Sequence, residues 1–400
     1  MKAKTFFSTQ FLDAEAIIDS FTEQGLGEVP EASLGVLYCE SSIEYEALVQ
    51  KLGQKVSFPI IGGTTMDFPV ENRGEDYSAI LMVIAKESMR FSVQVSDKLD
   101  GVEHTEQMNE LYAQGRSQLG EDPKLVMIFL PLMPHVRVSN FIDDIFASAG
   151  DIPVFGGVST SDLISTKAAV FYGGEVYREH MVLLMLGGDI KPVCASANQV
   201  TPMVEYAPVV TEAKGNEVLR VDSSTFCDYM REAGIRPEDR VSGVDALMQY
   251  GPIPVIVDSA ETQGTDVPEI RCISYTDPER GSAIFSASVQ EGSKIYMSIL
   301  RKQDVADSVA DCLHKLEERM KPAQQEGYTY SAFFCVTCVA RYFVQVGGTD
   351  VEGKFLAENV PEGCVPIGYY AFCEIGPTYR TTDGVMENKS HSASITMCAF

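Results

Sequence analysis

The chain has 400 residues, more than one ordinary hydrophobic core accommodates, so we expect two domains or two fused halves. A composition that is 45% hydrophobic and 22% charged is typical of a folded globular protein and excludes a disordered one. The formal net charge of −26 repels phosphate backbones and anionic lipid headgroups, which argues against nucleic-acid binding and membrane-surface binding.

The N-terminal segment lacks the uninterrupted apolar core of a secretory signal peptide, and no window reaches the roughly 18 apolar residues of a membrane span. The chain has ten cysteines with no dense spacing pattern, which is typical of a reducing compartment rather than of a disulfide scaffold. We therefore expect a soluble protein of the cytoplasm.

Short apolar segments predict a repeated β-α-β unit. Strands are expected where β-branched and aromatic residues are bounded by glycine, proline or charge, at 34–38, 57–61, 78–85 and 90–96, with a helix at 42–53. The same order returns with strands at 125–131, 151–157, 168–172 and 180–188 and a helix at 139–150. A third copy is indicated by strands at 330–338, 365–368 and 392–400.

These patterns predict an α/β fold of mixed, largely antiparallel sheets with helices on the outside, built from duplicated β-α-β-β units in two packed domains. We place the boundary near residues 215–225, with an N-terminal domain at 28–222 and a C-terminal domain at 223–390. The second domain is expected to contain strands near 253–258, 270–275, 282–288 and 294–300, and an amphipathic helix at 304–320.

Two glycine pairs, Gly62-Gly63 and Gly156-Gly157, each follow a proline and two apolar residues. Just past a strand end, bare backbone can approach a small ligand, and successive N–H groups can form an anion-binding nest. The alternative is a tight turn that needs a positive φ. Neither segment is a dinucleotide-binding fingerprint, and no phosphate-binding P-loop is present.

Cys335 and Cys338 form a CxxC pair in an apolar strand pattern, without the second ligand pair that zinc needs, so buried structural thiols are favoured. Arg341 follows the same strand, where a guanidinium must be paired. A ligand carboxylate fits its fork, and so does a protein carboxylate such as Glu374, itself an acid in an apolar segment. A structural ion pair and a ligand clamp both remain open.

In order and spacing, these segments resemble the FIST domain (F-box and intracellular signal transduction) in its paired N-terminal and C-terminal form. The resemblance covers about residues 30 to 390 and rests on 60–67 (IIGGTTMD), 153–162 (PVFGGVSTSD), 171–188, 210–222, 286–299, 338–341 (CVAR), 368–376 (GYYAFCEIG) and Asn388.

The resemblance implies a stand-alone sensory protein that binds a small ligand, with amino acids as the leading suggestion, and signals through a partner or self-association. We expect no cofactor and no metal. Under this interpretation Arg341 clamps a carboxylate, and Glu374 or Asp162 neutralises an ammonium. The backbone donors are Gly62, Gly63, Gly156 and Gly157, and the remaining site residues are Cys338 and Asn388.

Two rival hypotheses stay open. In the first, the chain is an enzyme whose nucleophile is Cys338, activated by the field of Arg341. Against it, the five histidines form no catalytic pattern and there is no HExxH motif. In the second, the chain is a ligand-independent interaction scaffold.

Overall fold

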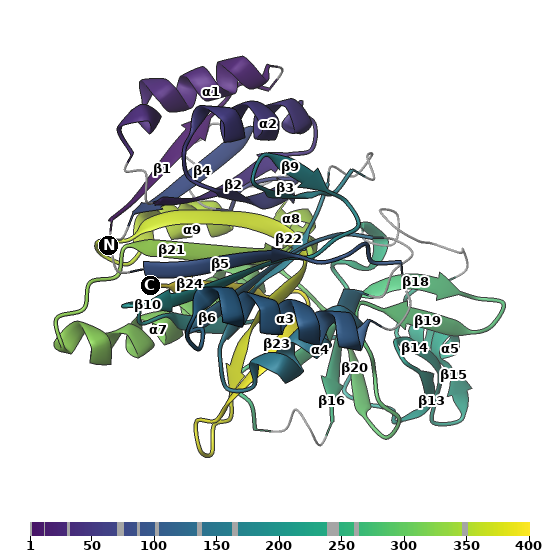
Figure 1. The fold of residues 1–400 in the computed structure, drawn as a ribbon. Coiled ribbons are helices and arrows are strands. Elements are labelled where there is room, and N and C mark those ends of the chain that lie inside the picture. Colours follow the sequence, from purple (N-terminus) through teal and green to yellow (C-terminus); the bar gives the residue numbers. More distant parts are fainter. Residues whose placement is uncertain are drawn as a thin grey trace.

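Two large sheets and a smaller attached part make up the molecule (Figure 1). The structure, a computed structural model, describes residues 2–11, 13–29, 33–69, 76–85, 89–100, 104–133, 138–161, 167–237, 248–259, 264–345 and 351–400. We call the part from Thr201 to Ile299 the insert, and the described residues on either side of it the body.

The body contains three copies of one unit of four main strands. A helical crossover joins the first strand to the second and another joins the second to the third, and the fourth strand completes the unit. Unit 1 consists of β1 (Lys2–Ser8), α1 (Ala14–Glu23), η1 (Leu26–Glu28), β2 (Ser33–Glu40), α2 (Tyr45–Lys55), β3 (Ile60–Thr65) and β4 (Ala79–Ala85). Unit 2 consists of β5 (Met89–Val95), α3 (Thr105–Leu119), β6 (Leu125–Pro131), α4 (Val138–Ala149), β7 (Val154–Ser159), β8 (Val170–Tyr172), β9 (Glu175–Tyr177) and β10 (Val182–Gly188).

Unit 3 begins with β11 (Val193–Ala197), is interrupted by the insert, and resumes about 100 residues later. It continues with α7 (Lys302–Gln325), β21 (Ala332–Cys338), α8 (Val339–Gln345), α9 (Val351–Asn359), β22 (Val365–Tyr379), β23 (Met386–His391) and β24 (Ile395–Ala399). The insert holds β12 (Thr201–Pro202), β13 (Val210–Lys214), β14 (Glu217–Val221), β15 (Ser224–Thr225), α5 (Phe226–Glu232), β16 (Val255–Asp258), β17 (Glu269–Arg271), β18 (Ile273–Asp277), β19 (Ser282–Phe285) and β20 (Lys294–Ile299).

The sheet order is the same in all three units: β1-β4-β2-β3, β5-β10-β6-β7 and β11-β24-β21-β22. In each unit the second and third strands are parallel, as β2 and β3 are, because a helix crosses between them. The final strand returns antiparallel. The predicted α/β class with largely antiparallel sheets is confirmed, and the third copy that the sequence indicated is present as unit 3.

Units 2 and 3 share one nine-stranded sheet, because β22 continues beyond its pairing with β21 and then pairs antiparallel with β7. The register shifts between Ala371 and Glu374, as at a β-bulge, and this bends the strand. Unit 1 forms the six-stranded sheet, whose β3 is flanked by the β8–β9 hairpin of unit 2.

The main core lies between the two sheets, where side chains such as Val36, Phe129 and Phe334 pack together. The outer sheet faces are covered by α1 and α2, by α3 and α4, and by α7 and α9, so the helices are outside, as predicted (Figure 1). Burial on both faces explains why β6 and β10 are almost continuously apolar.

The insert has its own core, so the body and the insert are two packed domains. The predicted boundary at 222/223 lies inside the insert, between β14 and β15, where Arg220 pairs with Thr225. None of the described helices is long and apolar enough to cross a membrane.

Candidate functional site

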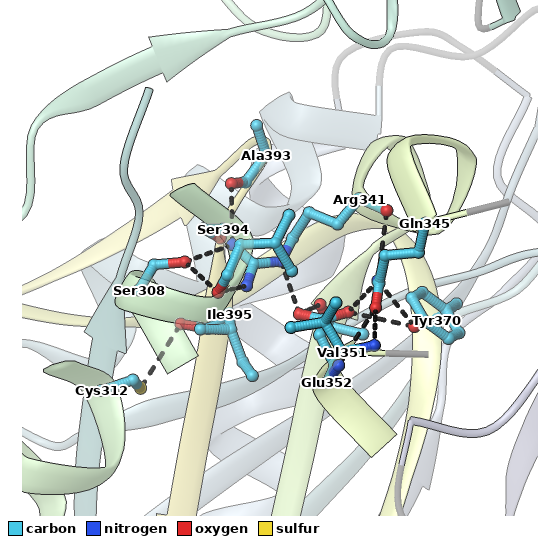
Figure 2. Close-up of polar contacts among 12 residues, drawn as sticks. Ser308, Cys312, Arg341, Gln345, Val351, Glu352, Tyr370, Ala393, Ser394 and Ile395 are labelled. Atoms are coloured by element: carbon cyan, nitrogen blue, oxygen red, sulfur yellow. Dashed lines mark hydrogen bonds and ion pairs between the residues drawn. The ribbon is translucent and has the colours of Figure 1, made fainter. Parts of the chain in front are cut away.

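Arg341, the predicted ligand clamp, lies in α8 directly after β21 and is completely buried. Its Nε donates to Oε1 of Glu352, on α9, over 2.7 Å. Nη1 donates to Ser308 Oγ at 2.8 Å and to the Ala393 carbonyl at 3.4 Å, and Nη2 donates to the Val305 carbonyl at 3.1 Å (Figure 2). Every guanidinium nitrogen therefore has a partner within the protein.

Glu352 has a full set of donors. Besides Arg341, Thr337 Oγ1 donates to Oε1 at 2.9 Å, and Gln345 Nε2 and Tyr370 Oη both donate to Oε2 at 3.0 Å. Gln345 also caps α9, since its Oε1 accepts the N–H groups of Val351 and Glu352 (Figure 2). The structural ion pair left open by the sequence is present, and the carboxylate that makes it belongs to Glu352 rather than Glu374.

Glu374 is also completely buried, in the part of β22 that pairs with β7. Its Oε2 accepts from the N–H and the Oγ of Ser394, at 3.2 and 2.7 Å, while its Oε1 has no hydrogen-bond partner. Burial, and secondarily the nearby Cys338, raises the pKa of this carboxyl well above its ordinary value. Burial without a cationic partner disfavours the charged form of Glu374, so its environment is not that of a counter-ion for an ammonium.

The turn between β23 and β24 is where Arg341 and Glu374 meet in the fold. Arg341 binds the Ala393 carbonyl, Glu374 binds Ser394, and the N–H of Cys338 donates to the Ser394 carbonyl at 3.0 Å. Ala393 has a φ of 53°, in the left-handed region that non-glycine residues rarely adopt. Contacts from the Arg341 and Glu374 side chains therefore hold a strained turn.

Cys338 is 2% exposed, and burial followed by its contact with Cys272 raises the pKa of its thiol well above the ordinary value. A cysteine nucleophile needs a lowered pKa and access to solvent. The environment of Cys338 has the opposite effect, as expected for a structural thiol.

The glycine pairs lie within strands β3 and β7, so the prediction that they lie just past a strand end is wrong. Each pair is flanked by strands on both sides, with Gly62 opposite Leu37 and Phe171. Gly62 has φ 153° and Gly156 has φ 139°, and a Cβ there would lie 1.8 and 2.1 Å from the carbonyl oxygens of Leu37 and Ile128. These glycines are required by close strand packing.

Asp162 lies outside the described residues. Asn388, on β23, ties the β22–β23 hairpin to the start of β7: its Oδ1 accepts from Val154 N–H at 2.8 Å, and its Nδ2 donates to the Ile152 carbonyl at 2.9 Å. Among the predicted site residues, Asn388 also lines a cleft between the body and the insert.

That cleft has a volume of about 250 Å³ and lies where α4 and the β22–β23 hairpin of the body face β16 and β17 of the insert. The body contributes Ser139, Asp143, Phe146, Thr378, Asn388, Lys389, Ser390 and His391, and the insert contributes Val257, Ser259, Thr265, Val267, Pro268, Glu269, Ile270, Arg271, Ala287, Ser288, Gln290 and Ser293. The walls are mostly polar, and they come from distant parts of the sequence.

Both signs of charge line the cleft. Arg271 forms an ion pair with Glu269, and its Nη1 donates to the Ile270 carbonyl at 3.1 Å, so its fork is held in one orientation. Desolvation raises the pKa of Asp143, although Arg271 and Lys389 oppose the shift. Burial lowers the pKa of His391 to about 4, with Arg271 and Lys389 adding to the effect, so its ring is neutral at pH 7.

Sequence reasoning missed Glu352, Arg271, Lys389 and Asp143. A signal existed for one of them, because a buried arginine requires a carboxylate and Glu352 follows Arg341 within the same crossover. The cleft residues carry no local pattern, and only the fold brings them together. No group of three or more His, Cys, Asp or Glu side chains that could hold a metal ion occurs in the described part of the chain.

The threefold α/β body with a docked insert and a cleft between them defines a two-domain protein with a small-molecule-sized site. The FIST N domain model matches residues 33–224 and the FIST C domain model matches residues 237–377. The chain belongs to the FIST family, as its motifs predicted. FIST domains are sensory domains of signal transduction, and this membership suggests a sensor role.

A search of curated proteins finds no match. Among solved structures, one described as cyanuric acid hydrolase from A. caulinodans has 10% sequence identity and a TM-score of 0.30, over 50% of this chain and 71% of that chain. A score this low carries no argument about this protein.

Proposed function

We propose that the protein is a cytoplasmic sensor that binds a small ligand, an amino acid or a related carboxylate, in the cleft and signals through a partner protein or through self-association. The observation that carries the proposal is the cleft itself, a charged cavity walled by both domains of a protein from a sensory family. The free thiol state of all ten cysteines supports a reducing compartment.

The ligand class follows from the cleft's side chains. Arg271 presents an oriented guanidinium fork, which suits a carboxylate, and Lys389 adds a second positive charge. Asp143 can neutralise an ammonium, while Glu269 is already paired with Arg271. Hydroxyl groups such as that of Ser288 complete a polar lining in which a zwitterion can pair both of its charges.

The clamp role that the sequence suggested for Arg341 passes to Arg271 in this proposal. Arg341 is enclosed by its bonds to Glu352, Ser308 and backbone carbonyls. Arg271 is also bonded, to Glu269 and to the Ile270 and Ser288 carbonyls, but it lines a cavity, so a ligand carboxylate can compete with Glu269 for its fork. A ligand that touches both walls binds the closed arrangement of the two domains better than an open one, and this differential affinity is what a sensor needs.

The test is a thermal-shift screen against amino acids and small organic acids, followed by calorimetry. A ligand at 100 times its dissociation constant stabilises the fold by about 2.7 kcal/mol. We expect Arg271→Gln to weaken binding at least tenfold, and Lys51→Gln, far from the cleft, to leave affinity unchanged. Equal affinity of wild type and Arg271→Gln contradicts the site, and a flat screen favours the ligand-independent scaffold.

A further inference from the structure

One short segment of the insert, residues 264–271, both lines the cleft and attaches the insert to the body. Thr265, Val267, Pro268, Glu269 and Arg271 line the cleft. Asp266, between two of them, is directed the other way and binds the body. The chain bends at residues 266 and 267, and the cleft wall and the attachment to the body are therefore parts of one short segment.

Asp266 makes four polar contacts with the body. Its Oδ2 accepts from Arg319 Nη2, on α7, at 2.8 Å, and its Oδ1 accepts from the backbone N–H of Tyr379, on β22, at 2.7 Å. The N–H of Asp266 donates to the Tyr379 carbonyl at 2.9 Å, and Lys315 Nζ donates to the Asp266 carbonyl at 2.9 Å. Hydrogen bonds to ionised groups are stronger than neutral ones.

The receiving side of this contact is held in place independently of Asp266. The guanidinium of Arg319 stacks 3.7 Å from the centre of the Tyr379 ring, and its Nη1 donates to the Cys194 carbonyl at 2.8 Å. Loss of the Asp266 charge therefore leaves Arg319 and Tyr379 positioned, so the contact can break and form again without rearrangement of the body.

Other polar contacts between the described parts of the two domains are mostly uncharged, and one lies in the same segment, where the Gly264 carbonyl accepts from the N–H and the Oγ1 of Thr381 at 2.7 and 2.8 Å. Asn198 Nδ2 donates to the Pro268 carbonyl at 2.9 Å, the hydroxyls of Ser286 and Ser392 lie 2.7 Å apart, and Thr201 Oγ1 donates to Asp304 at 3.2 Å. An apolar cluster that includes Cys272 of the insert and Cys338 of the body fills the junction. Within residues 264–268, Asp266 makes the contact with the body in which both side chains are charged.

We propose that residues 264–268 are a latch, with Asp266 as its attachment point, and that release of Asp266 from Arg319 and Tyr379 lets the insert move away from the body and opens the cleft. The importance of this opening for sensing rests on the function proposed above. The chain crosses between the domains only at residues 198–201 and 299–302, where it can act as a hinge.

The experiment measures opening without any ligand, as the rate at which N-ethylmaleimide labels Cys272, identified by mass spectrometry. Cys272 is 7% exposed at the domain junction. Asp266→Asn keeps the shape of the side chain and removes its charge. The lost charge-assisted bonds should raise the labelling rate of Cys272 about tenfold or more.

Two controls accompany the variant. Cys39, fully buried in the core of unit 1, reports global unfolding and should label no faster than in wild type. Glu318→Gln removes a carboxylate from the same helix α7 that pairs with Lys321, which is not a partner of Asp266, so it should leave Cys272 unchanged. If Asp266→Asn does not fold, Arg319→Lys replaces it, with the same expectation.

Equal labelling of Cys272 in variant and wild type overturns the latch, as does equal acceleration of Cys39 and Cys272. Because the assay contains no ligand, its outcome is separate from the ligand screen. Faster labelling of Cys272 alone, together with a flat screen, keeps the latch and refutes the proposed ligand.

Discussion

Replacement of Glu352 by glutamine tests how much the buried ion pair stabilises the fold. The substitution keeps the shape of the side chain but leaves the Arg341 guanidinium without its counter-ion, and both side chains are 0% exposed. Breaking a buried pair by removing one partner costs about 3–5 kcal/mol. Glu352 also accepts from Thr337, Gln345 and Tyr370, and an amide can satisfy only part of this set, so we expect about 4 kcal/mol.

The assay is equilibrium urea unfolding followed by far-UV circular dichroism, since the chain has no tryptophan. The double variant Arg341→Met/Glu352→Gln removes the stranded charge, so it should be more stable than Glu352→Gln alone. Glu15→Gln, which breaks the exposed pair with Lys51, serves as control and should change the midpoint little. The reasoning is refuted if Glu352→Gln is as mild as Glu15→Gln.

Three other variants test the buried positions. Gly156→Ala places a Cβ 2.1 Å from the Ile128 carbonyl oxygen and should prevent folding. Gly27→Ala, with open space around it, is the control and should shift the melting temperature little. A folded Gly156→Ala contradicts the steric argument. The pKa of His391 is lowered to about 4 in the fold, so between pH 6.5 and 4 this side chain is protonated in the unfolded chain but not in the folded one. The free energy of unfolding should therefore fall by about 3 kcal/mol as pH drops across that window. In urea titrations at several pH values, His391→Gln should flatten this fall. The raised pKa of Glu374 has the opposite effect, because stability is lost as pH rises above the ordinary pKa of a glutamate carboxyl. Glu374→Gln should therefore be at least as stable as wild type at pH 8. A clear loss of stability there would show that the carboxyl is ionised in the fold.

Much of the fold could be predicted because the strand segments are strongly apolar and the repeat recurs in order. The helix α3 was not predicted, since its buried residues, such as Met108 and Leu111, are diluted by polar side chains. The limits of the insert were harder to predict, because the β13–β14 hairpin has an ordinary hairpin turn and its sequence does not show whether it ends one domain or begins another. Local patterns show strands, but they do not show which strands pair across an interruption.

The candidate site was less predictable for a related reason. Burial of Arg341 could be inferred from the apolar strand before it, and so could its need for a carboxylate. Its actual partner, Glu352, occurs in a helix with several charged side chains, where an acid normally faces water. The choice between Glu352 and Glu374 depends on where the crossover after β21 places α9, and this is a property of the packed structure.

The interrupted third unit also determines when the body can be completed during synthesis. Val193–Ala197 must wait for Ile395–Ala399, about 200 residues later, before its backbone can pair. At about 5–20 residues per second, the ribosome needs roughly 10–40 s to deliver that partner. During this interval units 1 and 2 have been synthesised, while side chains that unit 3 adds to the core between the sheets, such as Phe334 and Tyr369, are still missing. Apolar surface of the first two repeats therefore stays exposed until the third repeat arrives.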